Sequence, residues 1–360
     1  VLGPVASQTS VDYLGTKDFS MRPRQWLNLI SRSKATISFS PPFGFELCAR
    51  RLRPGEAAEL DLSAWRVAGV GAEMIHPEVL QRFAAALAPS GFDPKAFVPC
   101  YGMAECSLAI SFSPLGEGIT LDRVDSERLA KDGLALAADP AAQAGDRVSG
   151  FVDCGIPLSE FEVEIRDERN QPLPERHTGS IHLRGPSVMA GYFRDPETTR
   201  QTLSVDGWLD TGDIGYRVGE RIFVTGRRKD MIIINGRNIW PQDIEYLAQQ
   251  QPEVRPGDCL AFSAPGPADE EMSVVVVQCR EKDPDIRADL VKRIKTLVRA
   301  ELGVDCHVEL APLHTLPRTS SGKLSRAKAR ENFIAHQQAA ELPVAADADL
   351  IKVSGQRGVG

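Results

Sequence analysis

Charged side chains stand inside four short glycine-containing segments of this chain. The segments are residues 99–105 (PCYGMAE), 207–213 (GWLDTGD), 226–230 (GRRKD) and 317–323 (PRTSSGK). The carboxylates of Glu105 and Asp213 can accept hydrogen bonds from hydroxyl groups or hold a divalent cation. The cations of Arg227, Lys229 and Lys323 can neutralise anionic groups. Such a set suits a reaction between two anions, in which catalysis consists mostly of positioning and charge neutralisation.

The last of these segments also invites comparison with the phosphate-binding loop GxxxxGK[ST]. That loop needs Gly at position 317, where this chain has Pro317, and Ser or Thr at position 324, where it has Leu324. Both departures remove groups on which the loop depends. A phosphate-binding loop of this type is therefore excluded, and Lys323 needs another explanation.

The four segments together resemble, in order and in spacing, the YGxTE, GWxxTGD, GRxKD and PxTxSGK motifs of adenylate-forming enzymes, which include acyl-CoA synthetases, adenylation domains and luciferases. The resemblance covers nearly all of residues 1–335. It implies that the enzyme uses ATP and Mg²⁺ to activate a carboxylic acid as an acyl-AMP. In that chemistry the substrate is already a carboxylate and no general base is needed.

The resemblance also assigns roles to individual residues. Glu105 is expected to hold Mg²⁺ against the phosphates, and Asp213 to accept hydrogen bonds from the two ribose hydroxyls, with Arg227 as a further donor to the nucleotide. Lys323 is expected to reach both the carboxylate and the α-phosphate, and Lys229 to be the hinge between domains. The expected adenine-side contacts are Gly71, Ala72, Glu73, Tyr101, Gly102, Met103 and Ala104. Among these, Tyr101 would stack on the base and Gly102 would let the backbone approach it.

Two departures from the general motifs point to one branch of the family. Ala104 stands where YGxTE has Thr, and Ile233 stands where coenzyme A ligases often carry a second lysine. Together with the segments RPRQWLNLISR, FGFELCARR and IIINGRNIWPQDIE, they resemble fatty acyl-AMP ligases. That resemblance implies a fatty acid substrate and transfer of the acyl group to an acyl carrier protein, or to a carrier domain of a polyketide or peptide synthase.

Two alternatives stay open. One is a fatty acyl-CoA synthetase, which would use coenzyme A as acceptor. The other is a non-catalytic nucleotide-binding fragment, because residues 1–100 contain no Ser/Thr/Gly-rich phosphate loop of the kind found near the start of the family's large domain. We accordingly expect roughly 200 upstream residues to be missing. The chain by itself is then expected to bind nucleotide poorly and not to turn over.

Apolar spacing and turn residues predict how the chain positions these groups. Stripes at helical spacing predict helices over 22–32, 77–87, 242–249 and 288–301, and short apolar runs predict strands at 35–39, 67–70, 97–99, 231–234 and 274–279. Asn235-Gly236 predicts a two-residue hairpin. The expected fold class is α/β: part of a large adenylate-forming domain with a mainly parallel sheet (1–149), a β-rich subdomain (150–225), a hinge (226–230), a small α+β lid (231–335) and a mobile tail (336–360).

Composition sets further limits. The net charge of −7 gives no sign of a nucleic-acid or membrane-surface partner, no apolar run approaches the ~20 residues of a membrane helix, and the N-terminal sequence does not resemble a signal peptide. Seven scattered cysteines without a CxxC pair indicate a reduced, cytoplasmic compartment. Three cysteines near the motifs (Cys100, Cys106, Cys154) are interpreted as structural and His76 as a helix-start residue. Residues 41–45 (PPFGF) are either a wall of the acyl tunnel or a buried aromatic loop.

Overall fold

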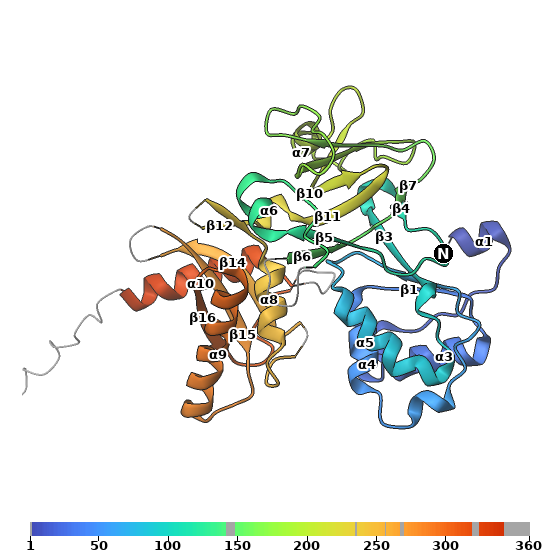
Figure 1. The fold of residues 1–360 in the computed structure, drawn as a ribbon, viewed down its shortest axis with the longest axis horizontal. Coiled ribbons are helices and arrows are strands. Elements are labelled where there is room, and N and C mark those ends of the chain that lie inside the picture. Colours follow the sequence, from blue (N-terminus) through green and yellow to red (C-terminus); the bar gives the residue numbers. More distant parts are fainter. Residues whose placement is uncertain are drawn as a thin grey trace, which may run out of the picture.

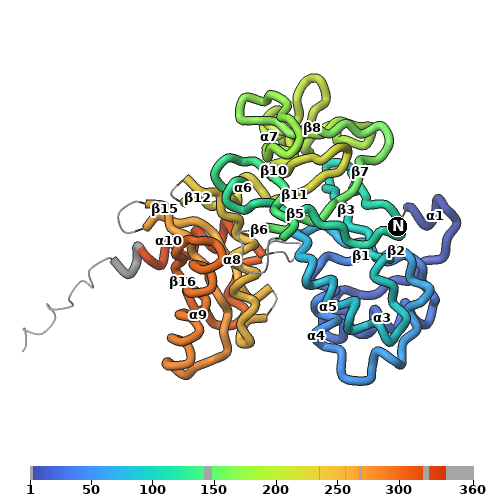
Figure 2. The backbone as a smooth tube through the Cα atoms, viewed as in Figure 1, coloured from blue at the N-terminus to red at the C-terminus, as the bar shows by residue number. Residues whose placement is uncertain are grey.

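The computed structural model describes residues 2–141, 148–234, 236–255, 257–266, 270–318 and 324–341. In Figure 1 the first third of the chain forms a helical and sheet layer at lower right, and the middle third lies above it. The elements from β12 onward lie to the left, beside the layer that carries α6 and β6 (Figure 2).

The first sheet has the strand order β1-β2-β3-β4-β7. Its strands are β1 (Ile37–Ser40), β2 (Val67–Val70), β3 (Phe97–Met103), β4 (Leu108–Phe112) and β7 (Ile156–Pro157). The pairs β1/β2 and β2/β3 are parallel, but β3/β4 and β4/β7 are antiparallel. The expectation of a mainly parallel sheet is therefore wrong beyond β3. The chain turns back through one short 3₁₀ turn, η4 (Ala104–Cys106), which is too short for the crossover that parallel pairing needs.

Helices pack against this sheet and bury an aromatic core. They are α3 (Arg24–Ser33), α4 (Pro42–Arg51) and α5 (Pro77–Leu87), preceded by the short α1 (Leu2–Ser7) and α2 (Thr16–Met21). Phe45 packs edge-on against Phe83 with ring centroids 5.0 Å apart, and Trp26 packs edge-on against Trp65 at 5.2 Å. Phe45, Phe83 and Trp65 are almost fully buried. The stripe predicted for 77–87 coincides with α5, and the helix predicted for 22–32 begins and ends slightly later, as α3.

Residues 41–45 do not form a loop. Pro42 opens α4, and Phe45 from that helix lies in the aromatic core. The prediction of a buried aromatic loop is wrong because proline is well tolerated in a first helical turn, so Pro41-Pro42 starts a helix instead of preventing one. Phe43, by contrast, is about half exposed.

The middle of the chain is built mainly from strands. A two-stranded ribbon joins β5 (Leu121–Asp125) to β6 (Val148–Val152), with α6 (Ser126–Asp132) between them in sequence. A four-stranded antiparallel sheet has the order β11-β10-β9-β8. Its strands are β8 (Glu162–Arg166), β9 (Gly179–Arg184), β10 (Leu209–Val218) and β11 (Arg221–Arg227), with α7 (Pro196–Thr202) preceding β10. The β5/β6 ribbon crosses the boundary expected at residue 149/150, and that boundary stays a prediction.

The residues after the GRRKD segment form what we call the C-terminal unit (232–341). Strands β12 (Ile232–Ile234) and β13 (Arg237–Ile239) pair as the predicted hairpin, with Gly236 in the left-handed conformation at φ 73°; Asn235 lies outside the described residues. The sheet β14-β15-β16 follows, formed by Cys259–Pro265, Glu271–Gln278 and Cys306–Ala311. The helices are α8 (Pro241–Gln249), α9 (Pro284–Leu302) and α10 (Arg326–Glu341).

This unit buries apolar residues of its own. One cluster joins Ile232 to residues of α8, α9 and the sheet, such as Ile244, Val275 and Ile294; a second joins Phe262 to Phe333 of α10. Gly303 caps α9 in the left-handed conformation, as predicted. Helix α10 continues through Glu341, although the tail was expected to begin at residue 336. The Ala- and Gln-rich sequence there has no apolar stripe but consists of good helix formers.

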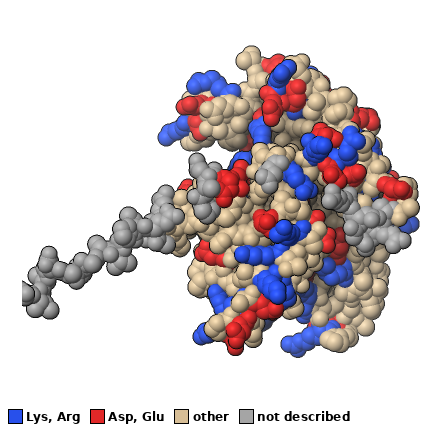
Figure 3. Space-filling model, turned by 60° about the vertical axis from the view of Figure 1, so that its left-hand side comes forward, with Lys and Arg blue, Asp and Glu red and all other residues tan. Residues whose placement is uncertain are grey.

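Both signs of charge are interspersed on the face of the molecule shown in Figure 3, in keeping with the moderate net charge of −7. None of the helices in the described part of the chain is long and apolar enough to cross a membrane.

Candidate functional site

Tyr101 and Asp213 come from different sheets and meet in a buried hydrogen bond. Tyr101 lies on β3 and donates from Oη to Asp213 Oδ2 on β10, at 2.7 Å. Both residues are buried. Burial raises the pKa of Tyr101 well above its ordinary value, and burial also raises the pKa of Asp213, opposed by the hydrogen bond from Tyr101. The bond joins residues 112 positions apart in sequence.

Arg227 completes this arrangement from the neighbouring strand. Asp213 of β10 and Arg227 of β11 are directly paired in the antiparallel register, and Arg227 Nε donates to Asp213 Oδ1 at 3.1 Å. Both oxygens of the Asp213 carboxylate therefore already accept one hydrogen bond. Because each carboxylate oxygen has about two acceptor positions, the group keeps capacity for further hydroxyl donors such as those of a ribose.

Glu105 lies on η4, directly after the strand that carries Tyr101. Its Oε1 accepts a hydrogen bond from Tyr192 Oη at 2.8 Å, and its backbone carbonyl accepts one from the Met189 amide at 2.7 Å. Glu105 is also close enough to Asp213 for its charge to raise the pKa of that carboxyl. The structure thus brings Tyr101, Glu105 and Asp213 together.

The donor set around Glu105 is compatible with Mg²⁺ held jointly with a nucleotide. The described residues contain no group of three or more His, Cys, Asp or Glu side chains that could form a metal cage. Mg²⁺ bound with ATP is usually held by one or two carboxylates plus the phosphates, so a cage is not required. Within the described chain, Glu105 Oε2 accepts no hydrogen bond, and it would be the oxygen for such an ion.

The glycines of the expected adenine-side segments stand where backbones approach closely. A Cβ at Gly102 would lie 1.8 Å from the carbonyl oxygen of Leu108, and one at Gly71 would lie 2.5 Å from that of Cys100. The turn after β2 places the exposed residue Ala72 at φ 66°, a left-handed conformation that L residues rarely adopt. Glu73 next to it is exposed as well. Gly71 thus lies beside the Cys100–Tyr101 strand, as its assignment to the same site requires.

Two further residues of the first motif differ in environment. Met103 is half buried and packs against the main apolar core, whereas Ala104 is exposed at the start of η4. Lys323 lies outside the described residues, as does most of its motif. The two flanks are close together: Arg318 and Leu324 form an antiparallel bridge, and the Ser325 amide donates to the Pro317 carbonyl at 2.9 Å.

The GRRKD segment is anchored on both sides of Lys229. Arg228 donates to Ser180 Oγ and to Asp210 Oδ2, each at 2.7 Å, which ties it to the four-stranded sheet. Asp230 accepts from Arg326 at the start of α10, at 3.1 Å, which ties it to the C-terminal unit. Lys229 between them is exposed and forms no ion pair with the described residues.

Arg326 is the centre of a partly buried network that sequence reasoning missed. Besides Asp230, its guanidinium donates to both carboxylate oxygens of Glu245 on α8, each at 2.8 Å. Tyr192 was missed in the same way. Neither position carries a local signal, because an arginine at a helix start and a tyrosine in a loop are both ordinary.

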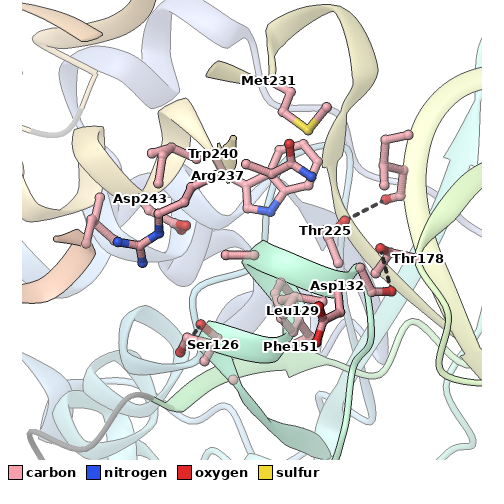
Figure 4. Close-up of a pocket in the computed structure, with 18 of the residues that line it drawn as sticks. Ser126, Leu129, Asp132, Phe151, Thr178, Thr225, Met231, Arg237, Trp240 and Asp243 are labelled. Atoms are coloured by element: carbon pink, nitrogen blue, oxygen red, sulfur yellow. Dashed lines mark hydrogen bonds between the residues drawn. The ribbon is translucent and has the colours of Figure 1, made fainter. Parts of the chain in front are cut away.

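A cavity of about 900 Å³ lies beside Arg228 and Met231, not at the Asp213 site. Figure 4 shows Met231, Trp240 and Asp243 of the C-terminal part facing Leu129 and Phe151 of the β5/β6 region. Its lining includes neither Tyr101 nor Glu105 nor Asp213. Burial raises the pKa of Asp243 to about 7. The cavity therefore adjoins the GRRKD segment and is separate from Glu105 and Asp213.

The cysteines and His76 have environments that match their structural interpretation. Burial raises the pKa of Cys100 and of Cys106 to about 11, and that of Cys154 to about 12, so none is activated as a thiolate. His76 precedes α5 as its N-cap, and its ring stacks on Tyr246 of α8 with centroids 4.5 Å apart. Burial lowers the pKa of His76 to about 4.

Comparison with known proteins decides the family. The profile of the AMP-binding enzyme family matches residues 1–193, more than half of the chain. The chain belongs to the AMP-binding enzymes. It is 48% identical over 93% of its length to a putative acyl-CoA synthetase of Caulobacter vibrioides, and 34% identical over 88% to a medium-chain-fatty-acid–[acyl-carrier-protein] ligase of Moorena producens.

Solved structures agree with this placement. A structure from a study of fatty acyl-adenylate ligases of E. coli and L. pneumophila superposes with a TM-score of 0.88 at 48% identity and covers 94% of this chain. The expected fold, an α/β adenylate-forming architecture, is thereby confirmed. The chain spans 58% and 55% of the lengths of the two sequence relatives and 60% of that structure.

Proposed function

We propose that this AMP-binding protein activates a fatty acid with ATP as an acyl-adenylate. The observation that carries the proposal is the convergence of Tyr101, Arg227 and Glu105 on or beside the buried carboxylate of Asp213, in a chain of this family. The similarity to fatty acyl-adenylate ligase structures supports the same chemistry.

The first step joins two anions. A fatty acid carboxylate oxygen attacks the α-phosphorus of ATP, the bond from that phosphorus to the bridging oxygen breaks, and pyrophosphate leaves with the electron pair. Asp213 accepts hydrogen bonds from the ribose hydroxyls and so fixes the nucleotide, while Arg227, whose side chain is about half exposed, adds a donor. Mg²⁺, when bound at Glu105, neutralises phosphate charge.

Lys323 supplies the positive charge between the two reacting anions in this proposal. Its ammonium is compact and sits on a flexible stem, so one side chain can contact both the attacking carboxylate and the α-phosphate. Gly71, Ala72, Glu73, Gly102, Met103 and Ala104 are proposed to line the adenine side of the site, with Tyr101. Lys229 is the proposed pivot about which residues 231–335 rotate as a lid.

The proposed acceptor is the phosphopantetheine thiol of a carrier protein or carrier domain. The thiol sulfur attacks the acyl carbonyl, a thioester forms, and AMP leaves. The name of the Moorena producens relative, an acyl-carrier-protein ligase, supports this acceptor. Ile233 on β12 supports it too, since the position where coenzyme A ligases often have a second lysine carries no charge here.

Coenzyme A is the second candidate acceptor, and the name of the Caulobacter vibrioides relative favours it. For location we propose the cytoplasm, because all seven cysteines are free and six of them are buried.

The test uses the protein expressed from its complete coding sequence. ATP, Mg²⁺ and a medium-chain fatty acid are supplied, then either coenzyme A or a holo acyl carrier protein, and products are followed by mass spectrometry. Acyl-AMP that accumulates with coenzyme A and is consumed by the carrier is the expected result. Efficient acyl-CoA formation would favour the second acceptor. No acyl-AMP from any fatty acid would refute the activity and leave a non-catalytic nucleotide-binding protein.

A further inference from the structure

Tyr192 makes a contact with the proposed cation ligand that the function above does not use. Its hydroxyl donates to Glu105 Oε1 at 2.8 Å, across 87 positions of sequence. A tyrosine hydroxyl keeps its proton at neutral pH, because the ordinary pKa of tyrosine is about 10. The hydroxyl is therefore a permanent donor to one carboxylate oxygen.

The loop that carries Tyr192 is itself fastened to the Glu105 turn. The Met189 amide donates to the Glu105 carbonyl at 2.7 Å, and Ser187 Oγ donates to the Cys106 carbonyl at 2.9 Å. These two bonds attach the loop to two successive backbone carbonyls of the η4 turn, those of Glu105 and Cys106. The position of the tyrosine relative to the carboxylate is thus set by backbone contacts, not only by its own hydrogen bond.

The backbone amide of Tyr192 is held by helix α7, which follows it in sequence. The Tyr192 amide donates to Thr199 Oγ1 at 2.9 Å, and Thr199 Oγ1 in turn donates to the Asp195 carbonyl at 2.7 Å. Gly191 makes this approach possible: at its φ of 150° a Cβ would lie 2.8 Å from Thr199 Cγ2. Tyr192 is therefore held at its hydroxyl and at its backbone amide, although its ring is partly exposed.

We propose that Tyr192 is a positioning residue for Glu105, which fixes one carboxylate oxygen and leaves the other available to the divalent cation that accompanies the nucleotide. This inference rests on the proposed function. A carboxylate free to rotate about its last bond samples orientations in which neither oxygen is placed for the cation. Outer hydrogen bonds of this kind typically change metal affinity by about 10–100-fold.

The experiment measures Mn²⁺ binding by electron paramagnetic resonance, in the presence of a non-hydrolysable ATP analogue, on the protein expressed from its complete coding sequence. Tyr192→Phe removes only the hydroxyl. Its dissociation constant for Mn²⁺ should rise about 10–100-fold. Its deficit in acyl-AMP formation should shrink as Mg²⁺ is raised, because weaker cation binding at a misplaced carboxylate is compensated by mass action.

The matched control is Tyr216→Phe, which removes another tyrosine-to-carboxylate hydrogen bond, the 2.9 Å bond from Tyr216 to Asp122, in which Glu105 takes no part. It should leave Mn²⁺ affinity unchanged. Thr199→Val loosens the support of Tyr192 without touching its hydroxyl and should weaken Mn²⁺ binding in the same direction, which keeps the test valid if Tyr192→Phe folds poorly.

The outcomes separate the two proposals. Normal Mn²⁺ binding by Tyr192→Phe and Thr199→Val, with binding lost in Glu105→Gln, overturns the positioning role and leaves the proposed function intact. Normal binding in Glu105→Gln as well removes the cation from Glu105 and overturns the inference with it. If the parent protein forms no acyl-AMP while Tyr192→Phe still weakens Mn²⁺ binding, the activity is refuted and the positioning role stands.

Discussion

Replacement of Arg326 by methionine should destabilise the C-terminal unit in a pH-dependent way. Arg326 donates to Asp230 and to both oxygens of Glu245, and the side chains of the three are only 23%, 14% and 13% exposed. Removing one partner of a fully buried ion pair costs about 3–5 kcal/mol, since a charge is left without compensation. The partial exposure of this network reduces the expected loss to about 2–4 kcal/mol.

The sign of the pH effect follows from Glu245. Burial raises the pKa of this carboxyl, and in the parent protein Arg326 opposes the rise. A carboxyl whose folded-state pKa is raised adds stability at pH values below its unfolded pKa, and that stability is lost as pH rises through the folded pKa. Without Arg326 the opposition disappears, so Arg326→Met should cost more at pH 8 than at pH 5.

Hydrogen exchange of the α8 and α10 amides measures this change locally, which matters because a chain of several units need not unfold in one step. Arg330→Met is the control on the same helix, since Arg330 is exposed and, among the described residues, donates only to the Ser263 carbonyl at 2.8 Å. The double variant Arg326→Met/Glu245→Gln should recover part of the loss at pH 8. A loss below about 0.5 kcal/mol, the range of ordinary surface substitutions, or a larger loss at pH 5 would refute the reasoning.

Four further substitutions have defined consequences. Asp213→Asn should lower kcat/KM for ATP about 10–100-fold in steady-state assays, because hydrogen bonds to a charged acceptor contribute about 1.5–3 kcal/mol; unchanged kinetics would remove Asp213 from the site. Asp243→Asn should reduce the loss of folding free energy that occurs as pH rises from about 4 to about 7. The effect is at most about 4 kcal/mol, because burial raises the pKa of Asp243 from 3.8 to about 7. Equal pH dependence of urea denaturation in both proteins would contradict it. Gly102→Ala should lower the melting temperature, since its Cβ would overlap the Leu108 carbonyl, and an unchanged melting curve would speak against this backbone approach. Phe83→Ala should cost about 3–5 kcal/mol in urea denaturation, as expected for a fully buried aromatic side chain, and a loss below about 1 kcal/mol would contradict its core position.

Local sequence signals predicted the elements that have a clear apolar stripe or a proline or glycine at a boundary. Helix α5 begins at Pro77 and ends at Leu87 as its apolar stripe indicated, and the β12/β13 hairpin closes at Gly236. The direction of β4 was not predictable in the same way, because strand direction depends on where the chain runs after Tyr101 and not on the strand's own composition. Helix α4 was not predicted, and residues 41–45 at its start were interpreted as a tunnel wall or a buried aromatic loop.

The candidate site shows the same division. Motif resemblance selected Glu105, Asp213 and Arg227, and tertiary structure brings these residues close together. The motif resemblance did not select Tyr192 or Arg326.

The sequence by itself determined the family resemblance, the order of the motifs and those helices and strands that have clear apolar spacing, because these depend on residue types and on spacing within a few turns of chain. Only the tertiary structure decided that Tyr101 bonds to Asp213, that Tyr192 holds Glu105 and that Arg326 joins Asp230 to Glu245. These contacts join residues 81 to 112 positions apart. Such pairings are chosen by the packing of whole sheets and helices, for which no single segment carries the information.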